Sequence, residues 1–86
     1  MSLYEAIASL DSSDKTRKFL DDICSPAELA ALEHRWLAAR LLADGKTYTE
    51  IISETKLSSA IVSRVNRVLR YGNGSLREAV NYSYEE

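Results

Sequence analysis

The most regular pattern of apolar and polar positions lies in the middle of the chain. Large apolar side chains recur there about every 3.6 residues, the period of an α-helix: Leu29, Leu32, Trp36, Leu37, Leu41 and Leu42. The segment Ser25-Pro26-Ala27-Glu28 has the sequence of a helix start, and Gly45 offers a left-handed stop after Asp44. The pattern therefore predicts one long helix from Pro26 to Asp44.

Shorter amphipathic segments precede this helix. Ser2 is a good N-cap for a helix from Leu3 to Leu10. The polar cluster Asp11-Ser12-Ser13-Asp14 ends that helix and caps a second one, which runs to about Ile23. Both carry apolar side chains on more than one side, so we expect them to pack against a partner surface.

After the long helix, the segment from Thr47 to Arg70 has the pattern of two short helices joined by a tight turn. Thr47 and Glu50 are spaced as a capping box for the first helix, and either Ser58 or Ser59 is a suitable N-cap for the second. Four apolar residues are spaced so that two steeply crossing helices bury one shared core: Ile51, Leu57, Val62 and Val65. This pattern predicts a helix-turn-helix.

Two positions depart from the usual form of that motif. Lys56 stands in the turn where glycine is usual, and a left-handed backbone there costs a lysine about 1 kcal/mol. Ile52 occupies a position of the first helix where a small residue is common. The alternative structure is an ordinary helical hairpin with a solvated polar face.

A last short helix is predicted after the break Tyr71-Gly72-Asn73-Gly74. Ser75 and Glu78 are spaced as a further capping box, for a helix from Leu76 to about Tyr82. The chain is thus expected to be all-α, with six helices.

The distribution of charged residues along the chain supports the prediction of a helix-turn-helix that binds nucleic acid. The chain has 11 Lys+Arg against 13 Asp+Glu, a net charge of −2. Residues 56–77 nevertheless contain five basic residues and no acidic one, whereas residues 1–33 contain seven acids and three bases. A basic stripe on the second helix is typical of a surface that faces nucleic-acid phosphates. The predicted DNA-binding residues are Lys56, Ser58, Ser59, Ala60, Ser63, Arg64, Asn66, Arg67 and Arg70.

The size and composition of the chain limit its class. Eighty-six residues, 45% of them hydrophobic, indicate one globular domain over residues 1–86. A helical chain this small often completes its core by pairing with a second copy, so we expect a homodimer. The single cysteine Cys24 excludes an internal disulfide, and neither a signal peptide nor a membrane-spanning run is evident. We therefore expect a cytoplasmic protein that does not bind membranes.

Residues 23–76 resemble the tryptophan-repressor (TrpR) family, and within it the short TrpR-related (YerC/YecD-type) branch. The resemblance is carried by the Ser-Pro start, the long Leu- and Ala-rich helix containing Arg35, the Gly stop, the Glu50-Ile51 pair and the run Ala60-Ile61-Val62-Ser63-Arg64. It implies an intertwined homodimer of five or six helices per chain that binds double-stranded operator DNA. A transcriptional regulator, and specifically a repressor, is the expected function.

The resemblance also implies an effector pocket. Family members hold L-tryptophan between two arginines, which Arg35 and Arg64 match, and Ser25 matches a threonine beside the ligand's amino group. Val65 and Val68 replace a glycine and a serine, and branched side chains there occupy space that an indole would need. The resemblance allows a small-molecule corepressor, but L-tryptophan is not the expected ligand, and no other cofactor is indicated.

Other chemistry is not indicated. His34 has no Cys or second His at ligand spacing, so no metal site is predicted, and Cys24 has no neighbouring His that would make it a nucleophile. No catalytic residues are predicted, and the chain is not expected to be an enzyme. The alternative function is a helical protein-interaction module that has lost DNA binding, which the net acidity permits.

Overall fold

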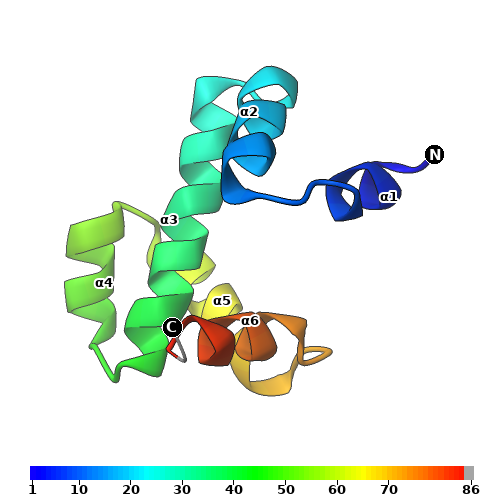
Figure 1. Ribbon diagram of the computed structural model, residues 1–86. Coiled ribbons are helices and arrows are strands. Elements are labelled where there is room, and N and C mark those ends of the chain that lie inside the picture. The colour runs from blue at the N-terminus through cyan, green and yellow to red at the C-terminus, as the bar shows by residue number, and fades with distance from the viewer. Residues whose placement is uncertain (85–86) are drawn as a thin grey trace. The chain divides into compact units, whose positions relative to one another are not determined.

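The computed structural model describes residues 1–84, and within them it contains six helices and no strand (Figure 1). In chain order the helices are α1 (Leu3–Ala8), α2 (Ser13–Ile23), α3 (Pro26–Ala43), α4 (Tyr48–Thr55), α5 (Ser59–Tyr71) and α6 (Ser75–Ser83). The predicted all-α fold with six helices is confirmed. The chain divides into two compact units, residues 1–31 and the remainder from residue 32 on, so that the boundary falls inside α3.

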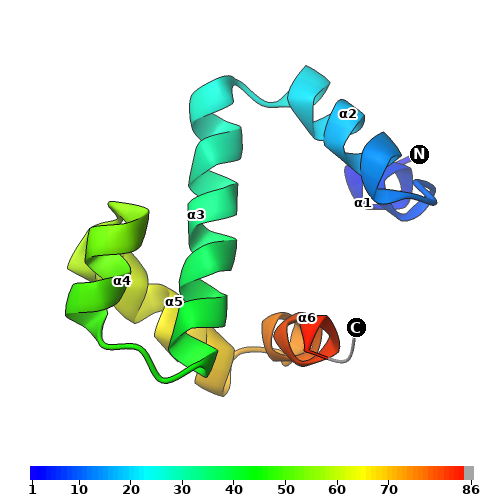
Figure 2. The ribbon, with the colours of Figure 1, turned by 60° about the vertical axis from the view of Figure 1, so that its left-hand side comes forward.

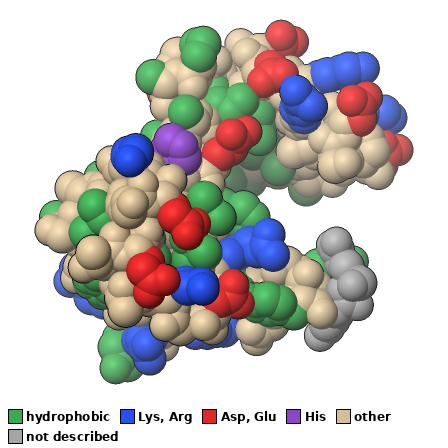
Figure 3. All heavy atoms as spheres, turned by 90° about the vertical axis from the view of Figure 1, so that its left-hand side faces the viewer, with side chains coloured by type: hydrophobic (Ala, Val, Ile, Leu, Met, Phe, Trp, Pro, Cys, Tyr) green, Lys and Arg blue, Asp and Glu red, His purple; other side chains and the backbone are tan. Residues whose placement is uncertain are grey.

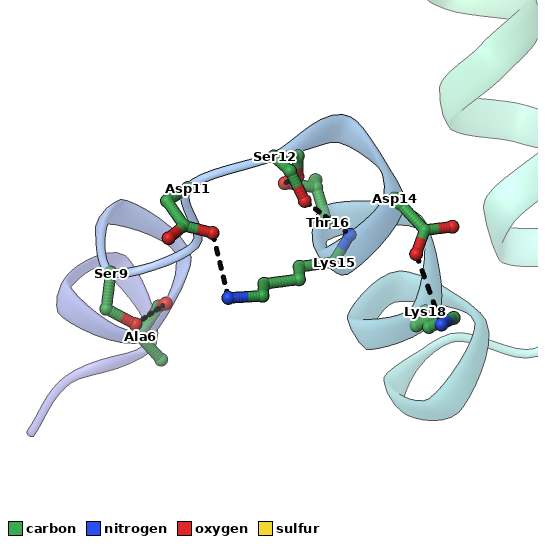
Figure 4. Close-up of polar contacts among 8 residues, drawn as sticks. All are labelled: Ala6, Ser9, Asp11, Ser12, Asp14, Lys15, Thr16 and Lys18. Atoms are coloured by element: carbon green, nitrogen blue, oxygen red, sulfur yellow. Dashed lines mark hydrogen bonds and ion pairs between the residues drawn. The ribbon is translucent and has the colours of Figure 1, made fainter.

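The first helix is shorter than predicted. α1 ends at Ala8 and not at Leu10. The hydroxyl of Ser9 donates to the carbonyl oxygen of Ala6 at 2.7 Å, as Figure 4 shows. Serine in this position competes for a backbone acceptor and favours the end of a helix.

Polar contacts fix the start of α2, as predicted from the Asp-Ser-Ser-Asp cluster (Figure 4). Ser12 is the N-cap, and its hydroxyl accepts the N–H of Lys15 at 3.1 Å. Two exposed ion pairs, Lys15 with Asp11 at 3.0 Å and Lys18 with Asp14 at 3.1 Å, link residues four positions apart. Neither α1 nor α2 contains a buried residue, so their apolar faces remain open to a partner.

The long helix α3 has the start and stop that its sequence predicts. Its N-terminus is closed by a reciprocal pair: the Ser25 hydroxyl accepts the Glu28 N–H at 3.2 Å, and the Glu28 carboxylate accepts the Ser25 N–H at 2.8 Å. At its C-terminus Gly45 has φ +83°, and the Lys46 N–H reaches back to the Leu41 carbonyl at 3.0 Å. This left-handed ending satisfies a carbonyl that the helix would otherwise leave free.

The core lies in the second unit, where α4, α5 and α6 follow the C-terminal half of α3 (Figures 1 and 2). All four helices and the turn between α4 and α5 contribute buried apolar residues: Ala38, Ala39, Ile51, Leu57, Val62, Val65, Leu69 and Val80. The four residues expected to form the shared core of the helix-turn-helix are among them. Ala38 and Ala39 of α3 are fully buried, which lets neighbouring helices approach α3 closely.

The predicted capping box of α6 is wrong. The helix begins at Ser75 with Gly74 as its N-cap, and no side chain caps it. The amide oxygen of Asn73 instead accepts the Ser75 N–H at 3.0 Å, a local turn typical of asparagine. Because that turn starts the helix one residue early, Ser75 is already helical and cannot cap Glu78. At the other end, Tyr84 donates to the carboxylate of Asp44.

Candidate nucleic-acid interface

The first helix of the helix-turn-helix is fixed at its start by the predicted capping box. The Thr47 hydroxyl accepts the Glu50 N–H, and the Glu50 carboxylate accepts the Thr47 N–H, both at 3.2 Å. These hydrogen bonds, the backbone one first, lower the pKa of the Glu50 carboxyl from its ordinary value of 4.5, because they stabilise the charged form. The capping box therefore fixes the residue at which α4 begins.

The turn places Lys56 in the left-handed region, with φ +61° and ψ +14°. It is the one non-glycine residue with positive φ among residues 1–84. The structure thus confirms that Lys56 takes the left-handed conformation usually taken by glycine in this turn. That conformation strains the backbone of a lysine by about 1 kcal/mol.

Thr55, immediately before the turn, was missed by the sequence reasoning. Its side chain is fully buried, yet both its polar functions are satisfied. The hydroxyl donates to the Ile51 carbonyl at 2.7 Å and accepts the Leu57 N–H at 3.3 Å. Thr55 thus ties the end of α4 to the residue after Lys56. The sequence shows only a hydroxyl residue directly before the turn, which does not tell whether that hydroxyl faces the core or solvent.

The second helix, α5, is anchored on one side and free on the other. Ser58 is its N-cap, since its hydroxyl accepts the Ile61 N–H at 3.2 Å, and this decides between the two serines considered. Val62, Val65 and Leu69 are buried against the core. The core therefore fixes which face of α5 points outward.

The predicted DNA-binding residues lie on the turn and the outward face of α5. Eight of them are exposed, and Asn66 is half-buried: the exposed set is Lys56, Ser58, Ser59, Ala60, Ser63, Arg64, Arg67 and Arg70. The ion pairs in the described part of the chain are confined to the Asp11–Lys18 region, so no carboxylate neutralises the arginines of α5 there. The surface combines hydroxyl groups near the start of α5 with guanidinium groups along its length.

A hollow of about 470 Å³ adjoins α5 on another side, within the second unit. Its lining comes from three helices: Leu32, Arg35, Trp36, Ile61, Arg64, Val65, Val68 and Leu76. The structure brings the predicted pair Arg35 and Arg64 together here. Ser25 belongs to the first unit, where its hydroxyl caps α3.

The side chains that line this hollow offer hydrogen-bond donors but almost no acceptors to a ligand. Apart from the two guanidinium groups, the lining side chains are apolar, and none of them is a hydrogen-bond acceptor, apart from the π face of Trp36. The arrangement suits an anionic group with an apolar body. The two valines narrow the hollow without filling it.

The remaining polar residues are not gathered into a further site. His34 is half-buried on α3, and Cys24, also half-buried, follows α2. Across residues 1–84 no cluster of three metal-ligating side chains is present. In the same residues, no helix combines the length and apolarity that crossing a membrane requires. Figure 3 shows one face of the molecule, with charged side chains of both signs on it.

Comparison with known proteins gives a consistent result. The family model described as Trp repressor protein matches residues 1–83. An uncharacterized protein, YerC of Bacillus subtilis, is 39% identical over 79 residues, which are 92% of this chain and 76% of YerC.

Two solved structures have the same fold. A TrpR-like protein from Eubacterium eligens superposes with a TM-score of 0.85 at 36% identity, over 93% of this chain and 82% of the other. A candidate Trp repressor from Staphylococcus aureus gives a TM-score of 0.87 at 32% identity, over 98% and 84%.

Proposed function

This chain belongs to the Trp repressor family of DNA-binding regulators, and from that membership we propose that it is a sequence-specific transcriptional repressor acting as a homodimer. The observation that carries the proposal is the outward face of α5, whose exposed serines and arginines are held by a buried opposite face. Such a helix suits the major groove, where hydroxyl and guanidinium groups recognise base edges and phosphates. The expected place of action is the cytoplasm, where operator DNA is accessible.

The apolar surface of the N-terminal helices supports the dimer. Several large side chains there are exposed, among them Leu3 at 49%, Tyr4 at 81% and Ile23 at 56%. Exposed apolar area of this kind is typical of a surface that a partner covers. A two-fold axis would place two copies of α5 about 34 Å apart, one turn of duplex, as a palindromic operator requires.

Selection of duplexes from a random pool tests sequence specificity. The wild-type protein should enrich a palindromic sequence. Ser63→Ala should reduce the ratio of affinities for the selected and random duplexes, because Ser63 would lie near base edges if the start of α5 enters the major groove. Ser53→Ala, the same chemical change at an exposed position of α4, is the matched control and should leave that ratio unchanged. Failure to enrich any sequence would contradict specific binding.

The hollow beside α5 supports a further part of this proposal, that operator binding does not need L-tryptophan. A bound tryptophan would bring an indole N–H and an ammonium group, both donors, to a lining whose polar side chains are also donors. Buried donors without acceptors oppose binding. We therefore propose that the protein binds DNA either constitutively or with an effector that carries a negative charge, because the lining of the hollow offers donors, and that is smaller than an indole, because Val65 and Val68 are branched.

Titration of operator binding with millimolar L-tryptophan tests this part. The expected operator affinity is the same with and without the amino acid. A tenfold enhancement, equivalent to a coupling of about 1.4 kcal/mol, would contradict it if Arg35→Ala abolished the effect. Arg17→Ala, which removes an exposed arginine of α2, provides the control for a general loss of charge.

The second candidate function is a protein-interaction module that has lost DNA binding. The net charge of −2 and the exposed apolar side chains of α1 and α2 favour it. The salt dependence of binding affinity distinguishes the two candidate functions. Binding through phosphate contacts weakens steeply as the salt concentration rises, whereas binding through an apolar interface changes little.

A further inference from the structure

A second hollow, of about 410 Å³, lies where α5 ends and α6 begins. Two arginines from different helices line it, Arg70 of α5 and Arg77 of α6, together with Leu69, Tyr71, Gly72 and Gly74. Arg77 was not among the predicted DNA-binding residues. The hollow opens beside the last turn of the helix that carries the exposed serines and arginines.

The guanidinium of Arg70 is held in place by a neighbour on α5. Its Nε–H donates to the amide oxygen of Asn66, one turn earlier, at 3.0 Å. Nε is a donor, so the amide must present its oxygen to it. This hydrogen bond uses one N–H of Arg70 and leaves the terminal NH₂ groups free. An arginine fixed in this way loses less conformational freedom when it binds an anion.

The path of the chain brings Arg77 to the same hollow. At Gly72 a Cβ atom would lie 2.5 Å from the carbonyl oxygen of Val68, so the backbone passes too close for any side chain. Gly74 then takes φ +95°, and α6 starts at once. The two glycines thus make the short connection that brings Arg77, which is half-buried, to the hollow that Arg70 also lines.

No described carboxylate neutralises either arginine. Within residues 1–84, no Asp or Glu oxygen lies within 4.0 Å of a side-chain nitrogen of Arg70 or Arg77, although Glu78 lines an adjoining hollow with Arg77. Two arginines that line one hollow, with no carboxylate partner among the described residues, suit an anion such as a phosphate, whose oxygens can accept hydrogen bonds from both.

We propose that Arg70 and Arg77 together bind one backbone phosphate of the DNA, and that Asn66 is a positioning residue for Arg70. The inference rests on the proposed DNA-binding function. Ser59 and Arg70 are eleven positions apart, about 16 Å along α5. The phosphate is therefore one that flanks the groove, beyond the bases that the start of α5 contacts.

Salt titrations of DNA binding test the role of Arg77. Arg77→Ala should weaken binding to selected and random duplexes alike and reduce the slope of log affinity against log salt, by less than about one unit per subunit because Arg70 still contacts the shared phosphate. Arg77→Lys keeps the charge and should keep the slope, which separates loss of charge from loss of packing at this half-buried position. Arg17→Ala on α2 should leave the slope unchanged. A wild-type slope in Arg77→Ala would overturn the proposal.

A double-mutant cycle tests Asn66. Asn66→Ala should lower affinity about two- to tenfold on both kinds of duplex, the cost of fixing one free arginine side chain. In the Arg70→Ala background the same change should have no further effect. An undiminished effect in that background, or a selective loss on the selected duplex, would show that Asn66 contacts DNA itself and would overturn its positioning role. Absence of DNA binding by the wild-type protein would overturn the proposed function as well, so the two failures are distinguishable.

Discussion

At the scale of single residues, Thr55 and Lys56 determine how α4 passes into α5. Thr55 satisfies the backbone on both sides of the turn from a fully buried position, and Lys56 takes the left-handed conformation that reverses the chain. The sequence indicates the role of Lys56, because the motif has a fixed place for a residue with positive φ. It does not indicate the role of Thr55, because a threonine hydroxyl can equally face solvent.

Lys56→Gly should stabilise the fold by up to about 1 kcal/mol, since glycine adopts positive φ without the steric cost of a side chain. Lys46→Gly is the matched control: Lys46 has no positive φ, and there the change should be neutral or destabilising. Urea unfolding at equal protein concentration measures both. DNA affinity of Lys56→Gly should fall at the same time, because a cation facing phosphate is lost, so stability and binding change in opposite directions.

Thr55→Val should destabilise the fold by about 1–3 kcal/mol, because the Leu57 N–H loses its acceptor in the core. Thr55→Ser keeps the hydroxyl and removes one methyl group, so its cost should be smaller, about 1 kcal/mol. Thermal and urea unfolding compare the two variants. A smaller loss for Thr55→Val than for Thr55→Ser would show that packing of the methyl group, and not the hydrogen bond, explains the burial of Thr55.

At the scale of helices, three reciprocal capping boxes start α1, α3 and α4. In each, hydrogen bonds from the cap serine or threonine lower the pKa of the glutamate: Glu5, Glu28 and Glu50. These starts are predictable because a capping box depends only on residues three positions apart. The start of α6 is not, because the amide oxygen of Asn73 accepts the Ser75 N–H that the Glu78 carboxylate would accept in a capping box.

The lowered pKa of Glu50 predicts a pH dependence of stability. The folded-state pKa lies below the ordinary value of 4.5, so the stabilising effect is complete above the unfolded-state pKa and is lost as pH falls through the folded-state pKa. Thr47→Ala removes the hydroxyl partner but keeps the backbone N–H, so it should raise the pKa of Glu50 only part of the way toward its ordinary value, as measured by NMR titration, and slightly flatten the acid limb of the stability curve. An unchanged Glu50 pKa in that variant would contradict the capping contact.

At the scale of the whole molecule, the second unit has a core and the N-terminal helices have none of their own. The sequence predicts this difference, since only the segment from the long helix onward combines a regular apolar period with a compact motif. The family resemblance implies the hollow that holds Arg35 and Arg64, but the local sequence pattern predicts neither hollow beside α5, because the lining residues come from helices far apart in the chain, such as Leu32, Ile61 and Leu76. Pairing of these helices in space depends on turn geometry that local patterns do not specify.

Light scattering should give the mass of a dimer, about twice 9.6 kDa, at micromolar concentration, because the exposed apolar faces of α1 and α2 need a partner. Substitution of Ile23 by Asp places a charge on such a face and should shift the equilibrium toward monomer. Asp22→Asn, at an exposed neighbouring position, should not. A wild-type mass of about 9.6 kDa would contradict the dimer without bearing on the fold of the second unit.

The most direct test of DNA binding through α5 is the salt dependence of wild-type affinity for a selected duplex, measured by fluorescence anisotropy. If Lys56, Arg67 and Arg70 of both subunits contact phosphates, six contacts release counterions, and affinity should fall about a thousandfold between about 50 and 200 mM salt. Arg67→Ala should make that fall less steep. An affinity that hardly changes over this range, or no measurable binding at its lower end, would contradict the assignment of α5 as a DNA-recognition helix.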